Sequence, residues 1–439
     1  MTSEPGEPGH AFVWVWLARN SEPVVAGRLD AIGESHVFTY GRSYLDRPDA
    51  IPLYMPELPL GDDAILPLAG TEPGCISDAA PDSWGRRVIL NRRFGRASQD
   101  TADLTLLSYL LESGSDRIGA LDFQGSSTQY VPRSAGQATL AELAESAELV
   151  ERGVPLAPAL AEALLGGTSI GGARPKAALE DADRRLIAKF SSRTDPYPVV
   201  QAEYVAMRLA AFAGLNVAKV ELTRPTGDKV ALLVERFDRE PGGCRLAMVS
   251  ALTILGLDET AARYASYADL AHEIRQRFSG PDATLHELFA RIILNILTGN
   301  TDDHARNHSA FWDGTELTLT PAYDICPQRR AGGETEQVMA IGQDGWRYSQ
   351  LAGCVKRAAT YHLTTGQARE IIDHQIHVIE SRWSDVCDGA KLDAIQRDRL
   401  WRTQFLNPYA LYDYKSAAAS AQRPPGRPRW GIEGHAISD

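Results

Sequence analysis

Three polar side chains are spaced around one expected hairpin in the second half of the chain. Asp302 begins a polar run, and Asn307 follows it by five positions. Two short apolar stretches, joined by an Asp-Gly turn at 313–314, then lead to Asp324. Carboxylate and amide oxygens are hard ligands that suit Mg²⁺, and a further carboxylate can orient an attacking hydroxyl group. These residue types could therefore hold a metal ion and position a nucleophile for phosphoryl transfer.

The same order of residues is used by protein kinases. There the first Asp orients the attacking hydroxyl, while the Asn and the second Asp hold Mg²⁺ on the nucleotide phosphates. By this pattern Asp302 is the candidate catalytic residue, and Asn307 and Asp324 are the candidate metal ligands. The simpler alternative is that these residues only cap turns, because Asp and Asn are common beside hairpin strands.

A glycine-rich segment at residues 166–176 lies upstream and ends in Lys176. Glycines let backbone N–H groups approach phosphate oxygens, and a lysine supplies a positive charge. A strand expected at 186–190 follows, with Lys189 near its centre, and Glu203 in the next helix is the candidate partner of that lysine. The alternatives are a flexible connection for the segment and a solvent-exposed strand position for Lys189.

Residues 233–239 join an apolar strand to a polar segment, where the expected sheet gives way to helices. A kinase hinge would present backbone groups to adenine at this boundary. The alternative is an ordinary strand end whose charged residues reach water.

Bulk properties indicate a globular protein. The chain has 439 residues, of which 44% are hydrophobic and 23% charged, enough for about two or three domains. Its net charge of −12 disfavours general binding to nucleic acid. Five dispersed cysteines favour reduced thiols and a cytoplasmic protein. Because no apolar stretch of about 18 residues occurs and the N-terminus lacks the pattern of a signal peptide, no contact with a membrane is expected.

Strands are expected mainly before helices, which predicts an α+β fold with two lobes like those of a protein kinase. The segment 140–165 is expected to be helical. The tail contains Gly-Arg-Pro-Arg at 426–429, which resembles a minor-groove hook, although a plain disordered tail is the alternative. The expected divisions are a mixed α/β N-terminal subdomain at 11–135, a nucleotide-binding lobe at 136–242, a helical catalytic lobe at 243–415 and a disordered tail at 416–439.

Several separated motifs, taken in order, resemble the HipA-like serine/threonine kinases, which are toxins of bacterial type II toxin–antitoxin modules. The resemblance covers nearly the whole chain, apart from the first ten residues and the tail. The motifs are Pro-Asp-Ser-Trp-Gly-Arg-Arg at 81–87, Ser-Ile-Gly-Gly-Ala-Arg-Pro-Lys at 169–176, Lys-Phe at 189–190, Glu-Arg-Phe-Asp-Arg at 235–239, Asn-Thr-Asp-Asp-His-Ala-Arg-Asn at 300–307 and Thr-Pro-Ala-Tyr-Asp-Ile at 320–325.

The resemblance implies a role for each motif. Asp302 is similar to the catalytic aspartate, and Asn307 and Asp324 are similar to the Mg²⁺ ligands. Lys189 is similar to the lysine that grips the phosphates of ATP, with Lys176 and Ser169 in the glycine-rich loop. Glu235 and Phe237 are similar to the hinge residues that contact adenine. Ser169 is also similar to the serine that family members phosphorylate in themselves to become inactive. Tyr-Asp-Ile replaces the Asp-Phe-Gly of ordinary protein kinases, so control by a moving Phe is not expected.

The resemblance also implies partners. Known substrates in the family are aminoacyl-tRNA synthetases and other components of translation. The usual partner is a small helix-turn-helix antitoxin, through which DNA would be contacted only indirectly. Two other functions stay open: a small-molecule phosphotransferase on a kinase-like fold, and a non-catalytic partner of a DNA-binding repressor. The presence of Asp302, Asn307, Asp324 and Lys189 together disfavours the second of these.

Overall fold

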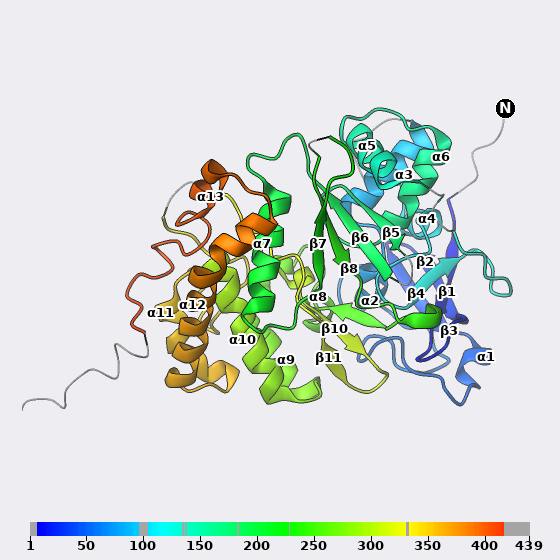
Figure 1. Ribbon diagram of the computed structural model, residues 1–439. Coiled ribbons are helices and arrows are strands. Elements are labelled where there is room, and N and C mark those ends of the chain that lie inside the picture. The colour runs from blue at the N-terminus through cyan, green and yellow to red at the C-terminus, as the bar shows by residue number, and fades with distance from the viewer. Residues whose placement is uncertain are drawn as a thin grey trace, which may run out of the picture.

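The computed structural model describes residues 7–95, 104–133, 136, 138–181, 184–227, 229–330 and 333–416. Figure 1 shows a mixed sheet-and-helix region beside a mainly helical one, which confirms the expected α+β class. The predicted tail and its Gly-Arg-Pro-Arg core lie almost wholly outside the described residues. No helix within the described ranges is long and apolar enough to cross a membrane.

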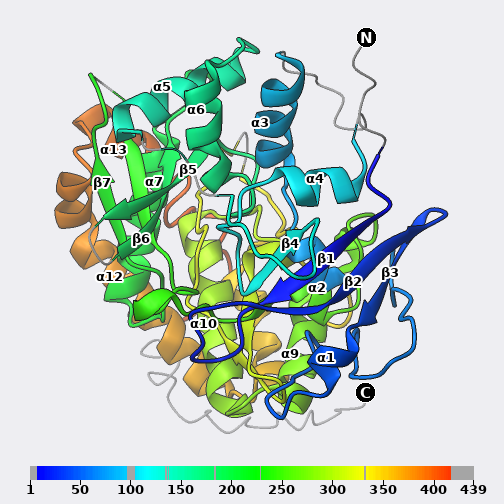
Figure 2. The same ribbon diagram turned by 90° about the vertical axis from the view of Figure 1, so that its right-hand side faces the viewer.

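The first sheet belongs to the N-terminal subdomain and is antiparallel in the order β3-β2-β1-β4. Ala26 and Leu29 of β2 and Phe38 and Tyr40 of β3 are buried in the main apolar core. Figure 2 shows this sheet beside α4, which contacts β1 and β4. The elements are β1 (His10–Val15), β2 (Val24–Ile32), β3 (Ser35–Tyr40), α1 (Arg42–Leu45), α2 (Gly74–Asp78), α3 (Ser83–Phe94), α4 (Leu106–Glu112) and β4 (Leu121–Gln124).

The second sheet is antiparallel in the order β5-β6-β8-β7 and carries the predicted phosphate-gripping lysine. One face packs on α7, and the other face packs on α3 and α5. The elements are α5 (Leu140–Glu151), α6 (Pro158–Ala163), β5 (Lys176–Asp181), β6 (Arg184–Phe190), α7 (Val199–Phe212), β7 (Val220–Thr223) and β8 (Ala231–Glu235).

The expectation of one continuous helix over 140–165 was wrong. Helix α5 begins at a capping box formed by Thr139 and Glu142, and it ends before Gly153, which has a φ of +71°. Proline at 155 cannot continue the helix, and Pro158 instead begins α6 as its first residue. The chain therefore turns between two short helices before it enters the glycine-rich loop.

The third sheet has the order β11-β10-β9 and contains the predicted hairpin at the boundary with the helices. A single cluster of buried apolar residues runs from the N-terminal sheet through α7 into α10 and α12. The elements are β9 (Met248–Ser250), α8 (Ala251–Ile254), α9 (Tyr267–Arg277), α10 (Pro281–Thr298), β10 (Ser309–Trp312), β11 (Leu317–Leu319), α11 (Leu351–Lys356), α12 (Thr365–Gly389) and α13 (Ala394–Leu400).

Candidate active site

Lys189 lies between two carboxylates that come from different parts of the fold. Its Nζ is 2.5 Å from Oε1 of Glu203 on α7 and also forms an ion pair with Asp324, which follows the hairpin. Burial disfavours a charged ammonium, but Asp324 and Glu203 together raise the pKa of Lys189. The expected pairing of Lys189 with Glu203 is present, and the lysine also joins the second sheet to the segment that follows the hairpin.

Lys176 faces the same space as Lys189. The two lysines are cross-strand neighbours on β5 and β6, so their side chains lie on one face of the sheet. Lys176 is only 4% exposed, and burial lowers its pKa, although Asp82, Asp324 and Glu203 oppose that change. Its Nζ lies against Gly172, where an added Cβ would come within 2.5 Å of it. Glycine at this position therefore leaves room for the ammonium.

Asp302 and its neighbour Asp303 face opposite environments in the catalytic loop, which we define as residues 302–307. Asp302 is exposed, and partial burial together with Asp324 and Asp303 raises the pKa of its carboxyl against the opposing effect of His304. Asn307 is 8% exposed, and its Nδ2 is 3.5 Å from the backbone oxygen of Asp302. The loop thus leaves the candidate catalytic carboxylate open to a reactant.

Asp303 is buried and anchors the catalytic loop. Its Oδ2 accepts hydrogen bonds from the Tyr267 hydroxyl, from Asn295 Nδ2 at 2.7 Å and from His308 Nε2 at 2.7 Å. Sequence reasoning missed this residue. The available signal was Asn295, a polar residue within the apolar run of α10, because a buried amide requires a partner.

Asp324 has an unusual backbone conformation and a well-defined charge. Its φ is +58°, in the left-handed region that Asp tolerates better than most residues. Burial disfavours its ionised form, but Lys189 and Lys176 lower its pKa to about 2. The hydroxyl group of the preceding Tyr323 donates a hydrogen bond to the backbone oxygen of Arg306 at 2.8 Å. This bond ties the segment that carries Asp324 to the catalytic loop. Asp324 is therefore a fixed carboxylate that stays ionised at neutral pH.

The predicted hinge follows β8. Phe237 contacts the Tyr323 ring at a centroid distance of 5.7 Å and the Phe311 ring at 6.0 Å, so it lies beside the hairpin and the segment after it that carries Asp324. The Glu235 side chain points toward solvent, where its Oε1 is 3.2 Å from Nζ of Lys219. Any contact of Glu235 with adenine would then use its backbone.

Ser169 faces the N-terminal subdomain in this structure. It is 1% exposed, and its Oγ accepts a hydrogen bond from Arg117 Nη1 at 3.2 Å. The nearby Arg174 is paired instead with Asp195 at 2.7 Å. Lys176, Glu203 and Asp324 lie around Lys189, and the charge of Asp324 acts on Asp302. Ser169 instead contacts Arg117, a residue that sequence reasoning did not identify.

Comparisons with known proteins match this chain to one family of kinases. Family models match the HipA N-terminal domain at residues 15–124 and the HipA-like C-terminal domain at residues 168–383. The serine/threonine-protein kinase toxin HipA of Shewanella oneidensis is 30% identical over 143 residues, which cover 28% of this chain and 33% of that protein. A putative kinase of Sinorhizobium fredii is 26% identical over 316 residues, which cover 66% of this chain and 71% of that protein. The match thus spans about a third of the length of the Shewanella relative.

One solved structure shares the fold over most of the chain. It is the complex of Shewanella oneidensis HipA with HipB and operator DNA, where the matched chain has a TM-score of 0.66 and 20% identity. The match covers 92% of this chain and 100% of the other. This likeness confirms the two-lobed arrangement expected from the sequence.

Proposed function

We propose, since the chain belongs to the HipA-like family, that it is an Mg²⁺- and ATP-dependent serine/threonine protein kinase. The observation that carries this proposal is the position of Lys189 between Glu203 and Asp324, with Asp302 open beside them. An ion pair that only stabilises the fold leaves no charge for a ligand. Here the ionised Asp324 pairs with Lys189 but is still 37% exposed, and its left-handed backbone fixes its orientation. A phosphoryl-transfer site needs this combination of fixed charges and an accessible carboxylate.

The residues present fit a bound Mg²⁺. Within the described residues no group of three His, Cys, Asp or Glu side chains could hold a metal alone. The Asn307 amide and the Asp324 carboxylate offer two hard oxygen ligands, and phosphate oxygens and water would complete the set. When bound, Mg²⁺ would neutralise charge on the phosphates.

Each remaining residue has a distinct task in this proposal. Lys189 and Lys176 hold the phosphates of ATP by charge, and Phe237 and the backbone near Glu235 form the adenine side of the site. Asp302 accepts a hydrogen bond from the attacking hydroxyl group and orients its oxygen. The raised pKa of Asp302 makes it a better proton acceptor than an ordinary carboxylate.

The finer proposal concerns biology. The chain would act in the cytoplasm as a toxin that phosphorylates a translation component such as an aminoacyl-tRNA synthetase. A small helix-turn-helix antitoxin would bind it, since the matched Shewanella chain is in complex with HipB and operator DNA. The net charge of −12 supports contact with DNA only through that partner. Phosphorylation of Ser169 by the enzyme itself would inactivate it, and the burial of Ser169 requires the glycine-rich loop to open first.

Incubation with labelled ATP, Mg²⁺ and a bacterial lysate tests the enzyme class. We expect label on a protein band with the wild-type chain and none with Asp302→Ala. Label confined to a small metabolite would favour the alternative small-molecule phosphotransferase, and no transfer at all would contradict both. Expression without a partner should arrest bacterial growth only if Asp302 is intact. Mass spectrometry after incubation with ATP would show whether Ser169 carries phosphate.

A further inference from the structure

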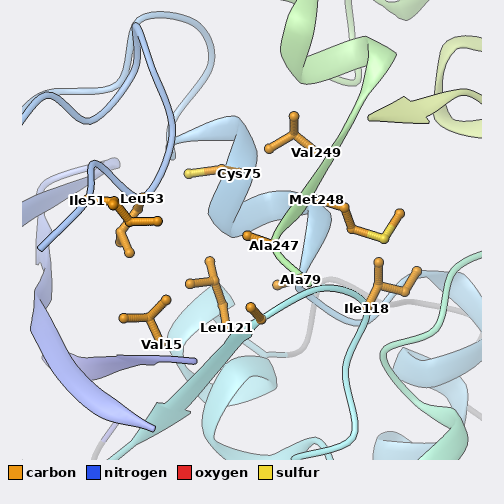
Figure 3. Close-up of a pocket in the computed structure, with 11 residues that line it drawn as sticks. Val15, Ile51, Leu53, Cys75, Ala79, Ile118, Leu121, Ala247, Met248 and Val249 are labelled. Atoms are coloured by element: carbon orange, nitrogen blue, oxygen red, sulfur yellow. The ribbon is translucent and has the colours of Figure 1, made fainter. Parts of the chain in front are cut away.

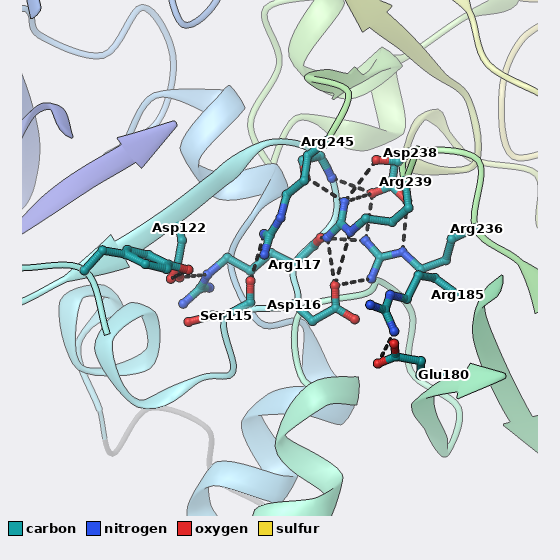
Figure 4. A network of polar contacts seen from close by, with 12 residues as sticks. Ser115, Asp116, Arg117, Asp122, Glu180, Arg185, Arg236, Asp238, Arg239 and Arg245 are labelled. Carbon is teal, nitrogen blue, oxygen red and sulfur yellow. Dashed lines mark hydrogen bonds and ion pairs between the residues drawn. The ribbon is translucent and has the colours of Figure 1, made fainter. Parts of the chain in front are cut away.

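Three charged residues of the hinge, Arg236, Asp238 and Arg239, contact one loop of the N-terminal subdomain. We call residues 114–119, between α4 and β4, the bridging loop. Arg236 donates to the backbone oxygen of Arg117 at 2.6 Å and to Asp116 Oδ1 at 2.9 Å. Asp238 accepts from the Gly119 N–H at 2.8 Å. Figure 4 shows the contact of Arg236 with Asp116, and the three contacts together tie the bridging loop to the hinge.

The other side of the bridging loop holds the glycine-rich loop. The Ile118 N–H donates to the backbone oxygen of Ser169 at 2.9 Å, and Arg117 Nη1 donates to Ser169 Oγ. The Gly114 N–H donates to Oγ1 of Thr168 at 3.2 Å. Thr168 and Ser169 are at most 1% exposed, so water cannot replace these bonds while the loops stay together.

Arg117 belongs to both sets of contacts. Its backbone oxygen accepts from the hinge residue Arg236, while its side chain donates to Ser169 in the glycine-rich loop. The Arg117 side chain is completely buried, and its Nε is 2.8 Å from Oδ1 of the equally buried Asp122 in β4. Because the charge is paired and the guanidinium is hydrogen-bonded on several sides, this residue has little freedom to move.

The end of the bridging loop is set into apolar packing. Ile118 of the bridging loop and Leu121 of β4 line a small cavity together with Met248 and Val249 of β9 (Figure 3). Strand β9 pairs with β10 of the hairpin that precedes Asp324. The bridging loop therefore rests on the same sheet that positions the candidate metal ligand.

We propose that the bridging loop positions both walls of the nucleotide site, by fixing the hinge through Arg236 and Asp238 and the glycine-rich loop through Thr168 and Ser169. The N-terminal subdomain would then be an obligatory part of ATP binding. Asp116, Arg117 and Thr168 are positioning residues in this proposal, because they act through the hinge and the loop. The inference rests on the proposed ATP-dependent function.

Two nearly isosteric substitutions test the hinge and the glycine-rich loop separately. Asp116→Asn removes the charge that Arg236 and Arg239 contact. It should weaken the binding of adenosine and the binding of ATP to a similar degree. Thr168→Val removes the hydroxyl that accepts a hydrogen bond from the Gly114 N–H. It should weaken the binding of ATP, while the affinity for adenosine stays within about two-fold of wild type. Calorimetry with adenosine and with ATP plus Mg²⁺ measures both, and we expect losses of about ten-fold, equivalent to about 1.4 kcal/mol.

A matched control comes from the same subdomain. Asp49→Asn removes the same kind of charge from a surface ion pair with Arg47, and it should leave both affinities unchanged. In the two test variants kcat at saturating ATP should stay within about three-fold of wild type while KM for ATP rises, since the reacting groups are untouched. If Asp116→Asn does not fold, Arg239→Lys tests the hinge side, because Arg239 also contacts Asp116 and the Gly119 oxygen.

The outcomes distinguish the inference from the function on which it rests. Wild-type protein that binds no ATP would overturn the proposed function and the inference with it. Wild-type binding together with unchanged adenosine and ATP affinities in folded variants of both walls would overturn the inference alone. Equal losses of adenosine and ATP in Thr168→Val would mean that the bridging loop supports only overall packing.

Discussion

The catalytic loop and the bridging loop both carry charged side chains, but they use them differently. In the bridging loop, Arg117 is fully buried and paired with Asp122, and Asp116 receives hydrogen bonds from two arginines. In the catalytic loop, Asp302 is exposed, and its carboxylate accepts no hydrogen bond within the described residues. One loop has its charges satisfied by the protein, and the other has a charge left for a ligand.

This difference indicates where rigidity and chemistry reside. A buried charge without a partner is costly, so a loop whose charges are all paired is held in one arrangement. An exposed carboxylate costs little in the folded state and stays free to contact a reactant. The pair Asp302 and Asp303 repeats the contrast within one loop, because Asp303 anchors the backbone that presents Asp302.

The largest expected effect comes from Asp302→Ala. Loss of the carboxylate that orients the attacking hydroxyl should lower kcat by about a thousand-fold. The melting temperature should stay near that of wild type, because this exposed side chain makes few contacts. Steady-state transfer from labelled ATP and a thermal melt measure the two quantities.

Asp303→Ala is the natural counterpart of that change. It leaves the buried donors of Tyr267, Asn295 and His308 without an acceptor, and should lower the free energy of unfolding by about 3 kcal/mol. A stable Asp303→Ala protein, or an unstable Asp302→Ala protein, would contradict the division of roles between the two residues.

The next effect concerns the metal. Asp324→Asn keeps the shape of the side chain but removes the charge that Lys189 now contacts. Mg²⁺-dependent binding of ATP should weaken, and turnover should fall by about a hundred-fold. That fall corresponds to a rise in the activation free energy on the order of 3 kcal/mol. Titration of Mg²⁺ at fixed ATP measures the change. The same Mg²⁺ dependence in Asp324→Asn and wild type would remove Asp324 from the metal site.

Sequence reasoning succeeded where a pattern is local or repeated in order. The two short apolar stretches joined by the Asp-Gly turn predicted the hairpin, which the pairing of β10 with β11 confirms. The position of Lys189 in a strand led to Glu203, with which it pairs. The α+β class followed from the order of strands and helices. The break between α5 and α6 was missed although Gly153 and two prolines mark it in the sequence, because the Ala-, Leu- and Glu-rich composition of 140–165 favours helix throughout.

The bridging loop could not be found in this way. Arg236 and Asp116 are 120 positions apart, so their ion pair leaves no periodic signal in either segment. The sequence predicted uses for Glu235 and Phe237 but none for the alternating Arg236 and Asp238. Only the fold shows that successive side chains of this motif face two different neighbours.

A smaller effect tests the paired charges of the N-terminal subdomain by pH. Burial disfavours ionised Asp122, but Arg117 and Arg133 lower its pKa from 3.8 to about 2. A depressed pKa gives stability that is fully present above about pH 4 and is lost as the pH falls toward 2. This residue alone should account for about 2 kcal/mol of that loss. Urea unfolding at pH 5, 4 and 3 should show a shallower pH dependence in Asp122→Asn, while exposed Asp63→Asn should follow wild type.

The smallest effect is expected at the solvent side of the hinge. Lys219 and Glu235 form an ion pair in which Lys219 is 81% exposed, so its loss should change the free energy of unfolding by at most about 0.5 kcal/mol. The Glu235 N–H bonds to the Lys219 backbone oxygen, and this bond survives side-chain substitution. ATP affinity should therefore stay within about two-fold in Glu235→Ala, whereas Phe237→Ala, which removes contacts with Tyr323 and Phe311, should weaken it clearly. A large loss in Glu235→Ala would show that its carboxylate contacts the nucleotide, and that this half-buried charge, like the exposed charge of Asp302, is available to a ligand.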